Sequence, residues 1–226
     1  MTATGVLPEA TAEAVVDRPD ATPGGAPERS LQEVRVVDAA LRCIARWGVA
    51  KTTLDDVARE ADWSRATVYR LFPGGKEAVL ETVVEVELER FFAALDGRLR
   101  AAPVLEDLLV AGMSEAGARI TGHPALRFLV THEPEVILPQ ISFARAERVL
   151  ARAASFASPY LARWLGPEEA RRVGEWVTRI VISYAASPSE SVAIADAGSV
   201  RRLVRSFVLP GVRASVDAQA RARPVS

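Results

Sequence analysis

The stretch of residues 52–76 carries polar side chains whose chemistry suits nucleic acid. An arginine can bind guanine through two hydrogen bonds and a threonine methyl can contact thymine, so Arg65 and Thr67 are candidates for base contacts. Hydroxyl and ammonium groups can bind phosphates and so orient a protein on DNA without reading its sequence. Arg70 suits either role, and we assign the phosphate role to Thr52, Thr53, Ser64, Tyr69 and Lys76.

Two short helices joined by a tight turn are expected to position these side chains. Thr53 can cap the first helix, with Asp56 in the capping-box position, and Ser64 can cap the second. Helical spacing gives each helix a face that can be buried: Leu54, Val57, Ala58 and Ala61 in the first, and Ala66, Val68 and Leu71 in the second. This pattern is typical of a helix-turn-helix, whose second helix enters the major groove. Arg65 and Arg70 alone would be ordinary solvated charges, but the motif around them favours binding.

At this point the chain resembles the TetR family of repressors, in the segments TTLDDVAREA, WSRATVYRLF and GGKEAVL. As an ordered set these segments are specific, and they cover roughly the first third of the expected folded region. Asp62 stands where the family usually has glycine, and aspartate tolerates the positive φ of such a turn. The connection from Phe72 to Lys76 is longer than usual in the family because of Pro73-Gly74-Gly75, which leaves the reach of Lys76 open.

The resemblance also implies a twofold dimer that presents two DNA-binding heads to two half-sites. The ending VRRLVRSFVLPGV looks like the C-terminal helix of the family. In the family the last two long helices pair with their copies in a four-helix interface. The side chains expected there are Trp176, Ile180, Tyr184, Leu203 and Phe207.

Helical patterns extend along the rest of the chain, with no strand-like alternation, so we predict an all-α fold. Prolines and glycines place breaks near Gly48, Pro103 and Gly122, and the last helix is expected to stop at Pro210-Gly211. Helices are predicted over residues 76–99, 104–121 and 137–157 and from Gly166-Pro167 onward. The predicted organisation is a disordered arm (1–29), a helix-turn-helix domain (30–91), a helical effector-binding and dimerisation domain (92–215) and a flexible tail (216–226).

The effector is expected to be small and apolar, such as a fatty acyl chain or a hydrophobic drug. The helix over residues 104–121 is interrupted by two glycines, which serve either close packing or room for a ligand between helices. If the space is for a ligand, Gly117→Leu should fill it, abolish the ligand response and leave operator binding largely intact. The candidate ligand residues are Leu108, Gly112, Gly117, Phe128, Phe143 and Phe156.

Composition favours a globular protein whose DNA contacts come from a local patch. The chain has 226 residues, a formal net charge of −1 and a pI near 6.2, with 49% apolar and 25% charged residues. Its single cysteine, Cys43, excludes an intrachain disulfide, is consistent with a cytoplasmic protein and is best explained by packing. No apolar run is long enough to span a bilayer, and the N-terminus has no secretion signal.

Enzymatic and metal-binding classes have little support in the sequence. Signatures such as G-x-S-x-G, a P-loop or H-E-x-x-H are absent, so neither catalysis nor a cofactor is predicted. His123 and His132 lack the i, i+4 spacing that puts two ligands on one helical face, so no metal site is predicted. We therefore expect a dimeric, ligand-responsive DNA-binding regulator, most often a repressor in this family. The alternative is a helical protein-interaction adaptor without sequence-specific DNA binding.

Overall fold

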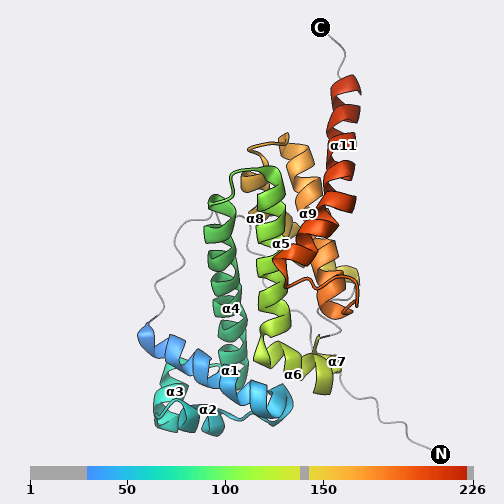
Figure 1. Ribbon diagram of the computed structural model, residues 1–226. Helices are drawn as coiled ribbons and strands as arrows, with labels where there is room; N and C mark the ends of the chain where they lie inside the picture. The colour runs from blue at the N-terminus through green and yellow to red at the C-terminus, as the bar shows by residue number, and fades with distance from the viewer. Residues whose placement is uncertain (1–29, 138–142, 223–226) are drawn as a thin grey trace, which may run out of the picture.

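The computed structural model describes residues 30–137 and 143–222, and every regular element in these ranges is a helix (Figure 1). The all-α prediction is confirmed. The elements in chain order are α1 (Leu31–Lys51), α2 (Leu54–Glu60), α3 (Arg65–Leu71), α4 (Gly75–Arg100), α5 (Leu105–Gly122), α6 (Pro124–His132), α7 (Pro134–Ile137), α8 (Phe143–Leu161), α9 (Pro167–Ala186), α10 (Ala197–Leu203), η2 (Val204–Val208) and α11 (Leu209–Ala222). The predicted N-terminal arm lies outside the described residues.

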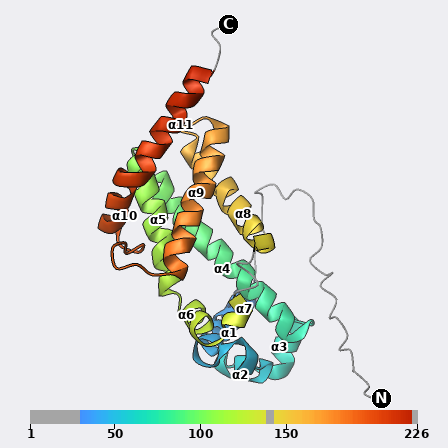
Figure 2. The ribbon, with the colours of Figure 1, turned by 90° about the vertical axis from the view of Figure 1, so that its right-hand side faces the viewer.

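The buried apolar side chains form two main cores that the long helix α4 connects. The first core joins α1, α2 and α3 to the start of α4 and extends to Val86. The second begins at Leu95 and continues through α5, α9 and α10 to Val212. In two perpendicular views, α1–α3 lie at one end of the molecule and α11 projects from the other (Figure 1; Figure 2).

A small third cluster, beside α4, joins α6 to α1. Ile44 of α1 packs against Ala125 and Leu129 of α6, and Leu80 of α4 lies against the same cluster. The helix α6 therefore lies directly on the three-helix head, although the chain reaches α6 only after α4 and α5.

Local capping explains where several helices begin. Ser30 and Glu33 form a reciprocal capping box at α1, and Thr53 and Asp56 form another at α2. Asp196 caps α10, while α9 begins with proline after Gly166, as the sequence predicts. Residues 101–104, which include Pro103, separate α4 from α5.

The prediction that the last helix stops at Pro210-Gly211 is wrong. The segment η2 is a wider helical turn, in which the Leu209 amide donates to the Val204 carbonyl, and α11 then continues through Pro210 to Ala222. A regular α-helix does not accommodate an interior proline easily, because proline lacks the N–H and crowds the carbonyl four residues earlier. Wide turns of this kind occur as single insertions in α-helices, and here one precedes the proline directly.

Close packing explains the two interior glycines of α5, Gly112 and Gly117. A Cβ atom on Gly117 would lie 2.4 Å from the carbonyl oxygen of Ile194, and one on Gly112 would lie 3.0 Å from Leu99 Cδ2. Leu108 is buried in the same core. The expectation of ligand space at Leu108, Gly112 and Gly117 is therefore corrected, because neighbouring protein atoms fill that space. For the same reason Gly117→Leu is not expected to be tolerated.

Two glycine-to-alanine substitutions should change stability in opposite directions. Gly117→Ala forces the Ile194 backbone to move and should lower the free energy of unfolding by about 1–3 kcal/mol. Gly97→Ala in α4 should raise it by about 0.5–1 kcal/mol, because a Cβ there meets nothing within 4 Å. Urea unfolding of both variants beside the wild type measures the difference. Equal stability of all three proteins would contradict the close approach at Gly117.

Candidate nucleic-acid interface

The turn between α2 and α3 has the geometry that a helix-turn-helix requires. Asp62 adopts φ 59°, the left-handed conformation anticipated for the residue that replaces glycine. Ser64 caps α3 by accepting a hydrogen bond from the Thr67 amide. The side chain of Val68 is fully buried and fixes α3 on the first core. The short helix is therefore held at both its start and its inner face.

The outer face of α3 presents the predicted DNA-binding side chains together. Arg65, Tyr69 and Arg70 are exposed, and Thr67 is half-buried. Ala66 is also exposed, so its predicted burial is wrong: on so short a helix, Val68 and the half-buried Leu71 supply the inner contacts. The result is a polar surface that a major groove can receive.

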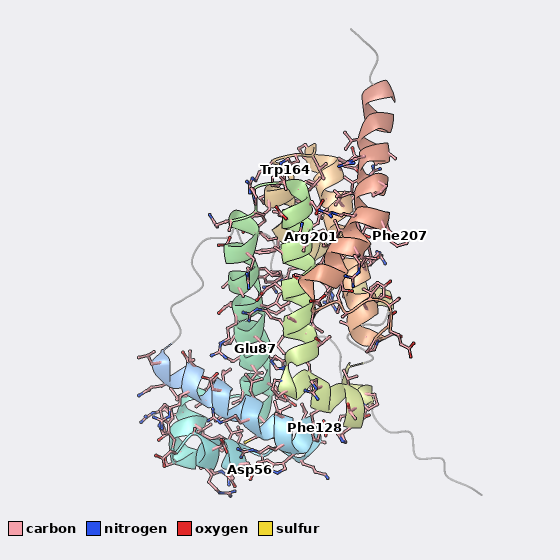
Figure 3. The ribbon with its side chains drawn as sticks, in the orientation of Figure 1. Asp56, Glu87, Phe128, Trp164, Arg201 and Phe207 are labelled. Carbon is pink, nitrogen blue, oxygen red and sulfur yellow. The ribbon has the colours of Figure 1, made fainter. Side chains whose placement is uncertain are left out.

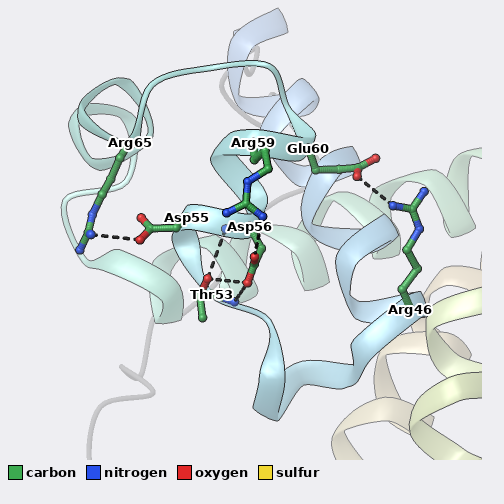
Figure 4. Close-up of polar contacts among 7 residues, drawn as sticks. All are labelled: Arg46, Thr53, Asp55, Asp56, Arg59, Glu60 and Arg65. Carbon is green, nitrogen blue, oxygen red and sulfur yellow. Dashed lines mark hydrogen bonds and ion pairs between the residues drawn. The ribbon is translucent and has the colours of Figure 1, made fainter.

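Arg65 is held in place before any DNA binds. Its guanidinium donates to Asp55 Oδ2 at 3.1 Å (Figure 4). It also donates to the Tyr69 hydroxyl at 3.3 Å. These two groups, the hydroxyl first, raise the pKa of Arg65, so the side chain stays cationic. Both members of the Asp55–Arg65 pair are well exposed, and such pairs contribute little stability. DNA can therefore replace Asp55 as the partner of Arg65 at low cost.

The capping box of α2 leaves Thr53 on the surface while Asp56 secures the helix. Asp56 accepts from the Thr53 amide and hydroxyl and pairs with Arg59, and the Thr53 hydroxyl is the first cause of a lowered pKa at Asp56 (Figure 4). The exposed Thr53 lies at the helix N-terminus, where backbone N–H groups favour phosphate. Glu60 at the other end pairs with Arg42 and Arg46 of α1.

Two of the predicted phosphate contacts have partners inside the protein. Thr52 is only 3% exposed and its hydroxyl donates to the Gly48 carbonyl at 2.6 Å, so its assignment to DNA is corrected to a structural one. The Lys76 ammonium donates to the Val49 carbonyl at 2.6 Å. That bond uses one of the three donors of the ammonium, and a phosphate contact by Lys76 stays a prediction.

The histidines and the cysteine serve structure. His123 Nδ1 accepts from the Leu126 amide at the start of α6, and its Nε2 lies 2.9 Å from Glu87 of α4. His132 stacks on Phe128 within α6. Among the described residues, no three metal-binding side chains gather at one point. Cys43 is buried, which raises the pKa of its thiol and lowers its reactivity.

Comparison with known proteins agrees with this geometry. Residues 36–83 match the family described as bacterial regulatory proteins, tetR family. Two HTH-type transcriptional regulators from strains of Mycobacterium tuberculosis are each 27% identical to the chain over 181 residues, covering 78% of it and 83% of their own length. The DNA-binding head, residues 36–83, is therefore that of the tetR family. Its family and relatives are transcriptional regulators rather than enzymes.

Several solved structures share the fold of this chain. The TetR family repressor AlkX from Dietzia sp. strain DQ12-45-1b, implicated in biodegradation of n-alkanes, is 22% identical, with a TM-score of 0.57 over 83% of this chain and 98% of that one. FadR from Bacillus subtilis, solved with stearoyl-CoA, is 18% identical, with a TM-score of 0.54 over 76% of this chain and 97% of that one. At such low identities these comparisons show the fold alone.

The residues predicted for the dimer interface divide into two groups. Trp176 of α9 is 41% exposed. Phe207 of η2 is 69% exposed and lies on the outer side of the molecule (Figure 3). Ile180 and Tyr184 are half-buried against the second core. Leu203 is only 8% exposed and belongs to that core, so its assignment to the interface is corrected. Sequence periodicity does not distinguish the inner face of α10 and η2 from the outer face, because both faces carry apolar side chains.

The predicted ligand residues also separate in the fold. Phe128 lies on α6, and the side chain of Phe143 lies outside the described residues. Phe156 of α8 belongs to an aromatic cluster with Phe91 and Phe92 of α4 and with Tyr160. Sequence reasoning missed this cluster because its two pairs, Phe91 with Phe92 and Phe156 with Tyr160, lie more than sixty residues apart. Within the described ranges no helix has the length and apolar character to cross a membrane.

Proposed function

We propose that the chain is a dimeric, cytoplasmic repressor that binds operator DNA through α3 and releases it when a small apolar ligand binds to the helical domain. The exposed polar face of α3, held by the Ser64 cap and the buried Val68, supports the DNA contact. Arg65 and Thr67 would contact bases, while Thr53, Ser64 and Tyr69 contact phosphates and Arg70 contacts either. The family assignment favours this function over the adaptor alternative.

The dimer is supported by the exposed apolar surface opposite the DNA-binding end. Trp176 and Phe207 are large side chains that water would otherwise surround, and a second copy would bury them. In a twofold dimer the same surface serves both subunits, and the two heads face successive half-sites. On this proposal residues 30–91 read the DNA, and residues 92–215 bind the effector and the second copy.

The ligand proposal rests on the aromatic cluster between α4 and α8. Phe92 and Phe156 lie with ring centroids 4.6 Å apart and are only partly buried. The Arg152 guanidinium lies 5.6 Å from the Phe92 centroid, so an apolar surface and a cation occur side by side. This chemistry suits an amphiphile with an acyl chain and an anionic head. The structural relative FadR binds such a molecule, stearoyl-CoA.

The test begins with DNA selected from a random pool by the purified wild-type protein. Operator affinity is then measured by fluorescence anisotropy with acyl-CoAs, free fatty acids and hydrophobic drugs. A hundredfold loss of affinity requires that the ligand prefer the unbound form by about 2.7 kcal/mol, within the usual range of allosteric coupling. Failure to select any sequence would reject the DNA-binding proposal, and equal affinity with every compound would reject the ligand.

Phe156→Ala should raise the ligand concentration needed for release by tenfold or more, because it removes an aromatic surface from the proposed site. We estimate this from the about 1.4 kcal/mol that corresponds to a tenfold change. The control is Val84→Ala, which truncates an apolar side chain that is 58% exposed on α4, outside the aromatic cluster. A response unchanged in Phe156→Ala, or lost equally in both variants, would place the ligand elsewhere.

A further inference from the structure

The end of α1 leaves helical geometry at Gly48. This residue has φ 82° and ψ 174°, and the Thr52 amide and hydroxyl both donate back to its carbonyl. A positive φ of this size favours glycine. The turn ends two residues before α2, so its conformation sets where the first helix of the helix-turn-helix begins.

A carboxylate from the effector-binding half of the chain binds this turn. Glu133 follows α6 and is only 8% exposed. Its Oε2 accepts the Val49 amide at 2.7 Å, and its Oε1 accepts the Ala50 amide at 3.3 Å. A Cβ atom on residue 48 would lie 2.1 Å from Glu133 Oε1, so glycine is needed for space as well as for conformation.

An ammonium holds the same peptide segment on its carbonyl side. Lys76, at the start of α4, donates to the Val49 carbonyl at 2.6 Å and reaches the Ala50 carbonyl at 3.5 Å. Hydrogen bonds to ionised groups are stronger than those between neutral groups. The segment Val49-Ala50 is therefore fixed between an anion on its N–H groups, from the residue that follows α6, and a cation on its C=O groups, from α4.

The segment Val49-Ala50, which Glu133 binds, lies close in sequence to the predicted DNA-binding residues. Thr53 follows three residues after Ala50, and Lys76 is itself a predicted phosphate contact. The other end of α6 is held by His123, which pairs with Glu87 of α4. The helix α6 is thus held to α4 by His123 at its N-terminal end and to the end of α1 by Glu133 directly after its C-terminal end.

We propose that Glu133 is a positioning residue for operator binding: its carboxylate holds Val49-Ala50 so that Thr53 and Lys76 reach the phosphates, and displacement of α6 withdraws it. The inference rests on the proposed operator binding. Glu133 touches no DNA itself and acts through the backbone of residues 49 and 50. In this way a change in the helical domain reaches the DNA-binding head through one side chain.

The test compares Glu133→Gln with Glu135→Gln, which removes the same charge from an exposed position on α7 two residues away. A glutamine keeps one oxygen, which at the position of Oε2 still lies 2.7 Å from the Val49 amide and 3.4 Å from the Ala50 amide. Its NH₂ group replaces Oε1 and faces the Ala50 N–H donor, and the negative charge that strengthens both hydrogen bonds is lost. Glu133→Gln should weaken operator binding about tenfold, within the range seen for residues that couple sites. It should also reduce the salt dependence of binding, because fewer phosphates are contacted. Hydrogen exchange over residues 48–53 should accelerate.

The control variant separates positioning from simple charge. Loss of a negative charge would by itself strengthen attraction to DNA, so Glu135→Gln should bind the operator as well as the wild type or slightly better. Operator affinity of Glu133→Gln equal to that of Glu135→Gln would overturn the inference, as would unchanged exchange over residues 48–53. Accelerated exchange that extends to the buried core of α5 would assign Glu133 to overall stability and overturn it too. If the wild type selects no DNA, the proposed function itself fails.

Discussion

Phe207→Asp should convert the protein from dimer to monomer while each subunit stays folded. The side chain is 69% exposed on η2, so aspartate there costs the isolated subunit little. In the proposed interface the same carboxylate would be buried without a partner, which costs several kcal/mol. Sedimentation velocity reports the assembly, and circular dichroism reports the fold.

Loss of the dimer should weaken operator binding by at least about a hundredfold, because two linked heads gain that much from binding together. Val84→Asp is the matched control, since Val84 is an equally apolar side chain, 58% exposed on α4, outside the proposed interface. Trp176→Asp should act as Phe207→Asp does. A soluble dimer of unchanged sedimentation in both variants would show that the subunits meet through another surface.

Arg65→Ala should cost about 1–3 kcal/mol of binding free energy on operator DNA and relax the preference at one base pair in each half-site. The physical reason is that a bidentate contact to guanine discriminates among bases, whereas a phosphate contact does not. Anisotropy titrations on the operator, on single-base variants of it and on random DNA measure both effects.

Arg98→Ala serves as the control, because it removes an arginine that is 68% exposed near the far end of α4 and pairs with Glu115. It should leave both affinity and base preference unchanged. Equal losses for Arg65→Ala on operator and random DNA would show that Arg65 contacts phosphate instead of bases.

The sequence alone determined the helices of the DNA-binding head and their caps. Ser30 with Glu33, Thr53 with Asp56, and Ser64 each act within three residues of chain, so the amino acids that form these hydrogen bonds are visible as a local pattern. The positive φ of Asp62 was predictable for the same reason, since it depends on the turn and the residue in it. The family resemblance lay in these same segments.

Only the tertiary structure decided which polar groups of the head are free to bind. The Thr52 hydroxyl belongs to Gly48, and the Lys76 ammonium meets a carbonyl 27 residues earlier in the chain. In the sequence Glu133 attracts notice only because it follows His132, whose spacing from His123 does not suit a metal site. In the structure it accepts a hydrogen bond from the Val49 amide, 84 residues earlier in the chain. Spacing along one helix cannot reveal such partners, because they depend on where α6 and α4 lie against α1.

For the apolar residues too, the sequence determined the helices, and only the tertiary structure decided which side chains are buried. Helical periodicity marked Leu108, Gly117, Leu203 and Phe207 as apolar or small, but it could not separate core from surface. In the structure the Ile194 backbone packs directly against Gly117. Leu203 is buried in the second core, whereas Phe207 is exposed. A helix can be apolar around most of its circumference, and only the placement of its neighbours determines which side is buried.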